Sequence, residues 1–434
     1  MLTREENELV TRTGRGTPMG ELFRRFWLPV ALAEEIPGPD CDPVRQKVLG
    51  EDLILFRDSS GRPGLMDAYC PHRGAPMFFG RNEENGLRCV YHGWKFDVEG
   101  SCVDLPNAPE GETFKQKVRI DAYPCVENHG LIWAFLGPKD KQPPFPQLPW
   151  VEQPKGHVFV KKFSLFCNYL QAMEGDYDPS HAGFLHCTLD QNNSNPAVDA
   201  TGGFIKDLLA DKLGRYAYFE NTDAGMNMVM TFKAGENKRM YIAGPWSMPI
   251  FCTAGLAGPG IYSSNMRIPI DDESLMFYRL RWSNSPLPER EIQSYEHGEY
   301  VYPKVIPGTW ITEQNKSNDY LIDRVSQRNY SYTGIKTFPL QDLAMMEDQR
   351  GPLMDRTKEH LASSDEAVIQ VRRRLIKEAR ALMEGVEPKA PWSPEAFRIH
   401  TARITVDEGT PLTEVAAQLR DLMWQANAPV PTVS

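Results

Sequence analysis

The sequence predicts an α+β protein: a small antiparallel β domain, then a larger domain with an antiparallel sheet flanked by helices and a helical C-terminus. Three observations support this fold class. Short apolar runs bounded by Gly, Pro or Asn fill residues 48–136. Residues 138–154 are rich in proline and begin without hydrophobic periodicity. The C-terminal part repeats apolar residues every three or four positions. We therefore expect an N-terminal helical segment that packs on the larger domain, the small β domain, and the larger domain at residues 1–40, 41–140 and 141–434.

The N-terminal elements follow from local signals. Thr17 and Pro18 are a typical N-cap and first helical residue, so a helix is expected to begin there. The apolar runs on either side of Gly50 predict a hairpin over residues 48–56. Further short strands of the small β domain are expected at residues 87–90, 95–98 and 130–136.

The elements of the larger domain begin after the proline-rich connection. Alternation of apolar and polar residues over residues 158–166, and in several runs between 215 and 282, predicts its sheet. Ser363 and Glu366 have the spacing of a capping box, and the apolar repeat that follows predicts a helix that ends at Gly385. A last helix is expected to start near Thr413.

Composition limits the partners and the location of the protein. The chain has 434 residues, of which 41% are hydrophobic and 24% charged, as in ordinary globular proteins. A net charge of −10 argues against nucleic acid as a partner. The N-terminus has no signal-peptide pattern, and no long uncharged apolar run occurs, so we expect a cytoplasmic protein that is not bound to a membrane.

Two short Cys-His pairs are the most specific motif of the chain. Cys70 and His72 form the first pair, Cys89 and His92 the second, each beside a glycine that suits a tight loop. Two thiolates and two imidazoles are the ligands of a Rieske [2Fe-2S] cluster. A structural zinc site is the alternative, but zinc fingers pair Cys with Cys and His with His, whereas each pair here is mixed. The motif therefore favours the iron-sulfur cluster.

A second group of metal-binding residue types lies in the larger domain. His181 and His186 are five residues apart and follow several carboxylates. This is not the spacing of one helix face, and such a pair alone could equally be an interior histidine and a helix-end residue. An electron carrier needs an acceptor, however, and two histidines with one carboxylate form the facial triad of non-haem Fe(II) oxygenases. The first motif therefore favours a mononuclear iron site here.

With both motifs in this order, the chain resembles the α (oxygenase) subunits of Rieske non-haem iron ring-hydroxylating oxygenases. The catalytic motif of that family is matched here by Glu174, Asp178, His181 and His186. Residues 341–361 are similar to the phthalate dioxygenase subgroup. The resemblance implies a larger domain of the helix-grip type and Asp342 as the third ligand of Fe²⁺, with Asp348 as the alternative.

The resemblance also implies partners and a route for electrons. Electrons from NAD(P)H would arrive through a separate flavin and [2Fe-2S] reductase, similar to phthalate dioxygenase reductase, since no nucleotide-binding glycine motif occurs in this chain. In the family, the equivalent of Asp178 joins a cluster ligand of one subunit to an iron ligand of the next, here His92 and His181. This implies a homotrimer, or a homohexamer of two stacked trimers.

The implied reaction is dioxygenation of an aromatic carboxylate, such as phthalate, isophthalate or a substituted benzoate, to a cis-dihydrodiol. A carboxylate is recognised by cations, yet Ile242 and Ala243 stand where a phthalate-type Arg is expected, which argues against ortho-phthalate. We expect substrate contacts from Lys206, Arg239, Ile242 and Trp246, and the candidate cations of the domain are Lys206, Arg215, Lys233, Lys238, Arg239, Arg267, Arg279 and Arg281. The alternatives are a monooxygenase or O-demethylase of an aromatic acid, and a Rieske electron-transfer protein.

Overall fold

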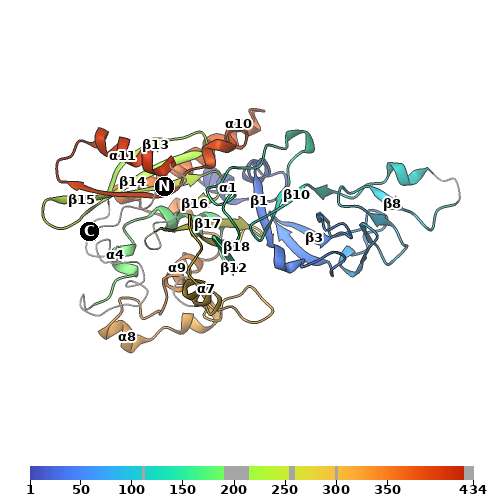
Figure 1. Ribbon diagram of the computed structural model, residues 1–434, viewed down its shortest axis with the longest axis horizontal. Helices are drawn as coiled ribbons and strands as arrows, with labels where there is room; N and C mark the ends of the chain where they lie inside the picture. Colours follow the sequence, from blue (N-terminus) through green and yellow to red (C-terminus); the bar gives the residue numbers. More distant parts are fainter. Residues whose placement is uncertain (110–112, 190–214, 254–259, 299–301, 425–434) are drawn as a thin grey trace.

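The protein has a small β domain at one end and a larger domain built on one wide sheet at the other (Figure 1). The structure is a computed structural model and describes residues 1–109, 113–189, 215–253, 260–298 and 302–424. The strands of the small domain lie on the right of Figure 1, whereas α4, α8 and α11 of the larger domain lie on the left. The two ends are thus held apart by the central part of the molecule.

The small domain contains two four-stranded antiparallel sheets. Their orders are β2-β3-β4-β9 and β5-β6-β7-β8. Apolar residues of both sheets, among them Phe56, Met66 and Phe96, form one core. The strands are β2 (Val44–Val48), β3 (Glu51–Arg57), β4 (Pro63–Asp67), β5 (Arg81–Glu83), β6 (Gly86–Arg88), β7 (Lys95–Phe96), β8 (Cys102–Asp104) and β9 (Ala122–Tyr123).

A third sheet connects the small domain to the larger one. Strand β1 (Trp27–Leu32) pairs with β11 (Leu131–Phe135), which also pairs with β10 (Cys125–Asn128). The turn between β2 and β3 reaches the large sheet as well, since the N–H groups of Leu49 and Gly50 donate to the carbonyls of Pro269 and Ile270. Residues before and after position 40 therefore share one sheet, and the predicted domain boundaries stay a prediction.

The larger domain is built on an eight-stranded antiparallel sheet. Its order is β12-β18-β17-β16-β15-β14-β13, and β19 pairs with β15. The strands are β12 (Val158–Leu165), β13 (Arg215–Asn221), β14 (Gly225–Lys233), β15 (Lys238–Ser247), β16 (Phe251–Cys252), β17 (Ile261–Pro269), β18 (Leu275–Ser283) and β19 (Ala402–Asp407). The helices are α1 (Arg4–Thr11), α2 (Pro18–Phe23), α3 (Tyr169–Glu174), α4 (Ala182–Leu185), α7 (Glu289–Glu296), α8 (Arg324–Asn329), α9 (Phe338–Glu347), α10 (Glu366–Met383) and α11 (Leu412–Trp424).

The two faces of the large sheet have different roles. On one face, Val229 and Tyr241 pack against Val415 and Leu419 of α11. Because side chains alternate along a strand, the neighbouring residues of β14 and β15 point to the opposite face, where α3 and the turn after it lie against β17. This second face is the one that carries the functional residues, and we call it the inner face.

The sequence-based fold class is confirmed, with local differences. The helix that begins after Thr17 and the hairpin around Gly50 are as predicted, and α10 ends at Met383, two residues before the predicted stop at Gly385. The capping box was wrong: a 3-10 turn covers Ser363–Asp365, so α10 begins at Glu366. Helix α1 and strand β19 were not predicted.

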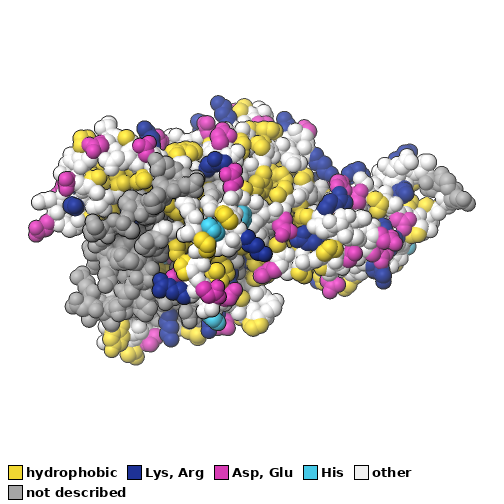
Figure 2. All heavy atoms as spheres, viewed as in Figure 1, with side chains coloured by type: hydrophobic (Ala, Val, Ile, Leu, Met, Phe, Trp, Pro, Cys, Tyr) yellow, Lys and Arg dark blue, Asp and Glu magenta, His cyan; other side chains and the backbone are white. Residues whose placement is uncertain are grey.

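The surface has no dominant sign of charge in the view of Figure 2, where acidic and basic side chains are interspersed. Among the described residues, no helix has the length and apolar character needed to cross a membrane.

Candidate metal centres

Two loops of the same construction carry the Cys-His pairs. In the first, the N–H of Gly74 donates to the carbonyl of Cys70 over 2.9 Å, and in the second the N–H of Gly93 donates to the carbonyl of Cys89 over 2.9 Å. Both glycines have positive φ, +69° and +81°, which residues with a Cβ rarely adopt. The glycines beside the motif thus let each loop turn back tightly.

The four donor side chains of these loops pair by type. Cys70 and Cys89 are each 2% exposed and their thiols are hydrogen-bond neighbours. The rings of His72 and His92 lie 4.6 Å apart between centroids. Burial, with the Cys89 thiol beside it, raises the pKa of Cys70 to about 11, so a thiolate requires a cationic metal next to it. The arrangement of two thiols beside two imidazoles fits a two-iron cluster with a different ligand type on each iron.

The indole of Trp94 supports the first imidazole and was not singled out from the sequence. Its ring stacks on His72 with centroids 4.3 Å apart and an interplanar angle of 11°. Trp94 is buried, and its Nε1 donates to Oδ1 of Asn107 over 2.9 Å. The plane of His72 is therefore fixed by a ring that is itself held in place.

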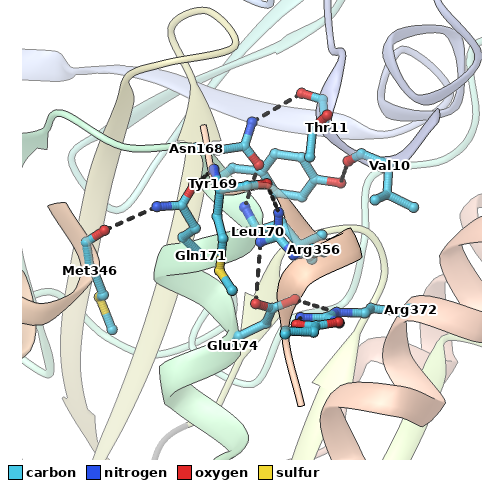
Figure 3. A network of polar contacts seen from close by, with 12 residues as sticks. Val10, Thr11, Asn168, Tyr169, Leu170, Gln171, Glu174, Met346, Arg356 and Arg372 are labelled. Atoms are coloured by element: carbon cyan, nitrogen blue, oxygen red, sulfur yellow. Dashed lines mark hydrogen bonds and ion pairs between the residues drawn. The ribbon is translucent and has the colours of Figure 1, made fainter. Parts of the chain in front are cut away.

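In the larger domain, α3 leads into the second motif and is anchored on three sides (Figure 3). Nδ2 of Asn168 donates to Thr11, Nε2 of Gln171 to Met346, and Glu174 pairs with Arg356 and Arg372. The Glu174 side chain is only 12% exposed. Burial raises the pKa of Glu174, but the two guanidinium groups outweigh it and hold that pKa below its ordinary value. The acidic residue of the motif thus fastens α3 to α10.

The chain then breaks before the first histidine. Asp178 is extended, with φ −104° and ψ 104°, because Pro179 disfavours helical backbone in the residue before it. The motif is therefore not one helix, which agrees with the five-residue spacing of the two histidines. Oδ1 of Asp178 accepts hydrogen bonds from N and Oγ of Ser180 over 2.8 and 2.6 Å. Oδ2 lies 3.5 Å from Nδ1 of His181, at the upper limit for a hydrogen bond.

His181, His186 and Asp342 converge, with one donor atom from each lying within 4.8 Å of the others. Oδ1 of Asp342 is 3.7 Å from Nε2 of His181 and 3.2 Å from Nε2 of His186. Burial raises the pKa of Asp342, but His186, His181 and Arg279 outweigh it and hold that pKa below its ordinary value. The carboxylate and two imidazoles form the donor set of a facial triad, so these residues fit a mononuclear Fe²⁺.

Gln341 orients the second histidine and was not assigned a role from the sequence. Its Oε1 lies 2.7 Å from Nδ1 of His186, while its Nε2 donates to the carbonyl of Ile335 over 2.7 Å. Because the amide nitrogen is used, the oxygen faces the imidazole, so Nδ1 carries the proton and Nε2 keeps its lone pair. The position next to Asp342 was the signal that could have indicated this residue.

Other acidic residues near the triad have separate partners. Asp348, the alternative third ligand, pairs with Lys316 at the surface. Asp176 forms an ion pair with Arg267 and accepts from Nδ2 of Asn265 over 2.7 Å. Asp342 is therefore the carboxylate that the fold brings to both histidines, and Arg267 is already neutralised within the protein.

The four residues expected to contact substrate do not lie together in the structure. Ile242 and Trp246 are buried on the inner face and line a small cavity of about 30 Å³ together with Asp176 and Tyr177. Arg239 is two residues from Tyr241 in β15 and therefore lies on the outer face, the face that α11 covers. It pairs with Glu408 over 3.6 Å, so the structure does not bring it to the triad. Lys206 lies outside the described residues.

A cavity of about 940 Å³ opens beside the triad and is lined by Asp178, His181, Asp342, Phe184 and Tyr332, among others. Within one chain, the cluster loops belong to the small domain at the right of Figure 1, whereas α4, between the two histidines, lies at the left. His92 and Asp178 of the same chain are therefore not brought together.

Known proteins match this chain over most of its length. The family model described as "Rieske [2Fe-2S] domain" matches residues 26–124, and the one described as "LigXa C-terminal domain like" matches residues 134–396. The phthalate 4,5-dioxygenase oxygenase subunit of Pseudomonas putida is 36% identical and covers 89% of this chain and 88% of its own. The 3-chlorobenzoate-3,4-dioxygenase oxygenase subunit of Comamonas testosteroni is 34% identical over 88% of this chain and 89% of its own.

A demethylase and a solved structure are also similar. The 5,5'-dehydrodivanillate O-demethylase oxygenase subunit of Sphingobium sp. is 33% identical and covers 96% of this chain and 91% of its own. Dicamba monooxygenase, solved with dicamba bound, has the same fold with a TM-score of 0.57 at 18% identity, covering 83% of this chain and 98% of its own.

Proposed function

Because this chain belongs to the oxygenase subunits of the Rieske non-haem iron ring-hydroxylating oxygenases, in the phthalate dioxygenase-like subgroup, we propose that it dioxygenates an aromatic carboxylate to a cis-dihydrodiol. It is an oxidoreductase with a [2Fe-2S] cluster and Fe²⁺ as cofactors. The convergence of His181, His186 and Asp342 below a cavity is the observation that carries the proposal. Two dioxygenases of aromatic carboxylates among the relatives support the substrate class.

We assign the metal ligands from the donor sets. Cys70, His72, Cys89 and His92 would hold the cluster, and His181, His186 and Asp342 would hold Fe²⁺. When bound, the cluster would supply electrons and the mononuclear iron would activate O2 beside the substrate.

The surrounding residues keep the ligands in their productive form. Gln341 keeps the proton of His186 on Nδ1, so Nε2 of His186 keeps its lone pair. The carboxylate of Asp178, 3.5 Å from Nδ1 of His181, would do the same for His181 on moving slightly closer. Burial lowers the pKa of His181, but Asp178 and Asp342 outweigh it and raise that pKa above its ordinary value.

We further propose that electrons pass between subunits. The small domain and the triad of one chain lie at opposite ends, so the neighbour of Asp178 would be His92 of another protomer, in a homotrimer or a stacked homohexamer. His72 and His92 are partly exposed, which such a contact requires. As an oxygenase subunit, the protein would receive electrons from a separate reductase, similar to phthalate dioxygenase reductase and fed by NAD(P)H.

Turnover with a panel of aromatic acids tests the proposal. With a phthalate-type reductase and NADH, phthalate, isophthalate and chlorobenzoates are compared by product mass and coupled O2 uptake. A product that gains two oxygens and two hydrogens supports dioxygenation, whereas absence of coupled O2 uptake with every acid refutes the proposed substrate class.

O-demethylation is the second candidate function. The match to the LigXa-like C-terminal model and the 33% identity to a demethylase subunit favour it. The same assay decides between them with methoxylated benzoates, because a demethylase releases one methyl group as formaldehyde and leaves a phenol.

A further inference from the structure

Strand β18 places two arginines on the inner face of the sheet. Arg279 and Arg281 are two residues apart in β18 and therefore point to the same face. That face is the inner face, because Arg279 stands opposite Asn265 in β17, whose Nδ2 donates to Asp176 in the turn after α3. Both arginines thus point to the face of the sheet that α3 covers.

Arg281 is buried and has no ion pair with the described residues. Its residue is 5% exposed, and its Nε and Nη1 atoms have no hydrogen-bond partner among the described residues. Ser263, opposite Arg281 in β17, is 2% exposed, and its Oγ also lacks a partner in the described part of the chain. Buried donors of this kind are costly unless something accepts their hydrogen bonds. The two side chains together are aimed at an acceptor that the described chain does not provide.

The neighbourhood of Arg281 is apolar and positively charged. The ring of Tyr295 lies 6.0 Å from its guanidinium carbon, and Phe159 stands opposite it in β12. Burial and the charge of Arg281 together lower the pKa of Arg279 to about 10, so Arg279 remains a cation near neutral pH. Lys161, opposite Arg279, already donates to the carbonyls of Tyr295 and Glu296. An aromatic anion matches both the rings and the charge of this region.

We propose that Arg281, with Arg279 and Ser263 beside it, binds the carboxylate of the aromatic substrate. The inference rests on the proposed oxygenase function and deepens it, since it names the group that selects an acid over a neutral compound. Guanidinium can hold a carboxylate through two parallel hydrogen bonds, and Ser263 can add a third from its hydroxyl. Arg279 is the arginine whose charge acts on Asp342, so we expect the ring to extend from the carboxylate past Arg279 toward the triad.

Equilibrium binding to the intact holoenzyme tests this site. Phthalate, isophthalate, 3-chlorobenzoate and 3-phenoxybenzoate are titrated anaerobically, each beside its methyl ester, into the wild type and three variants. In Arg281→Gln we expect the acid that binds to the wild type to lose affinity about 30-fold or more, with the ester changed less than about threefold. Arg281→Lys keeps the charge, so its affinity for the acid should lie between those of the wild type and Arg281→Gln. Arg239→Gln, on the outer face, is the matched control and should bind as the wild type.

Correct folding of the variants is checked by the cluster absorbance and the iron content. If Arg281→Gln does not fold, the binding test is made with Arg281→Lys. The inference is overturned if Arg281→Gln binds the acid as tightly as the wild type, if acid and ester lose affinity equally, or if no acid of the panel binds. Oxygenation of neutral compounds alone would also overturn it while leaving an oxygenase function intact. Tight acid binding without coupled O2 uptake would instead count against the proposed function only.

Discussion

Replacing Gln341 by Met should weaken iron binding without changing the cluster. The amide of Gln341 is the acceptor for the buried Nδ1–H of His186, at 2.7 Å. Methionine has a similar length but no carbonyl oxygen, so the Nδ1–H group would remain buried without an acceptor. His186 is only 7% exposed, and water therefore has little access to replace the lost partner.

The size of the effect follows from this geometry in two ways. A buried donor without a partner costs about 1–3 kcal/mol. Loss of a group that orients a metal-bound histidine typically lowers metal affinity about 10–100-fold. Since about 1.4 kcal/mol corresponds to a factor of ten, the two estimates agree. We therefore expect the dissociation constant for Fe²⁺ to rise by one to two orders of magnitude.

Anaerobic titration of the iron-depleted triad with Fe²⁺, in competition with a chelator, measures this constant. Cluster absorbance is the internal control, because Gln341 does not touch the small domain. Gln341→Glu is the matched control variant: its carboxylate still accepts from Nδ1, so affinity should stay near that of the wild type. A folded Gln341→Met protein with wild-type affinity would refute the view that this amide orients His186.

Three further predictions concern the same region. Asp178→Asn should keep both metals but lose most turnover, as measured by metal content and coupled O2 uptake; full activity would rule out a bridging role. His181→Ala should lose the mononuclear iron and keep the cluster, so a third iron per chain that survives the change contradicts the ligand assignment. Glu174→Gln should destabilise the larger domain by about 3 kcal/mol, because Arg372 and Arg356 lose a buried partner. Since the folded pKa of Glu174 lies below its ordinary value of about 4.3, this difference should be full above that pH and shrink in more acidic urea titrations.

Much of the fold could be predicted from local patterns. The helix after Thr17 and the hairpin around Gly50 depend on residues that are neighbours in the chain. The start of α10 could not be located from Ser363 and Glu366, because the turn before it closes through the carboxylate of Asp365 and the N–H of Ala362. Strand β19 was missed because its extended conformation depends on pairing with β15, and the sequence of residues 402–407 does not reveal that partner.

The residues of the candidate site also divide into those that the sequence indicates and those that only the fold brings together. Both Cys-His pairs and the two histidines could be recognised because each set lies within a few residues, and their types specify metal chemistry. Asp342 came from the resemblance to a family, and only the fold shows it beside the histidines while Asp348 turns to Lys316. Gln341 and Trp94 were missed, since their roles depend on which atom each side chain faces.

The basic residues show most clearly what the sequence determines and what the tertiary structure determines. The sequence determined that the larger domain offers several arginines and that a metal centre lies in it, because residue type and short spacing carry that information. Which arginine remains for an anion was decided by tertiary structure. Arg267 is neutralised by Asp176 and Arg239 lies on the far face with Glu408, whereas Arg281 is buried on the inner face without an acceptor in the described chain. Strand alternation and register between distant segments set these environments, and neither can be read from one stretch of the chain.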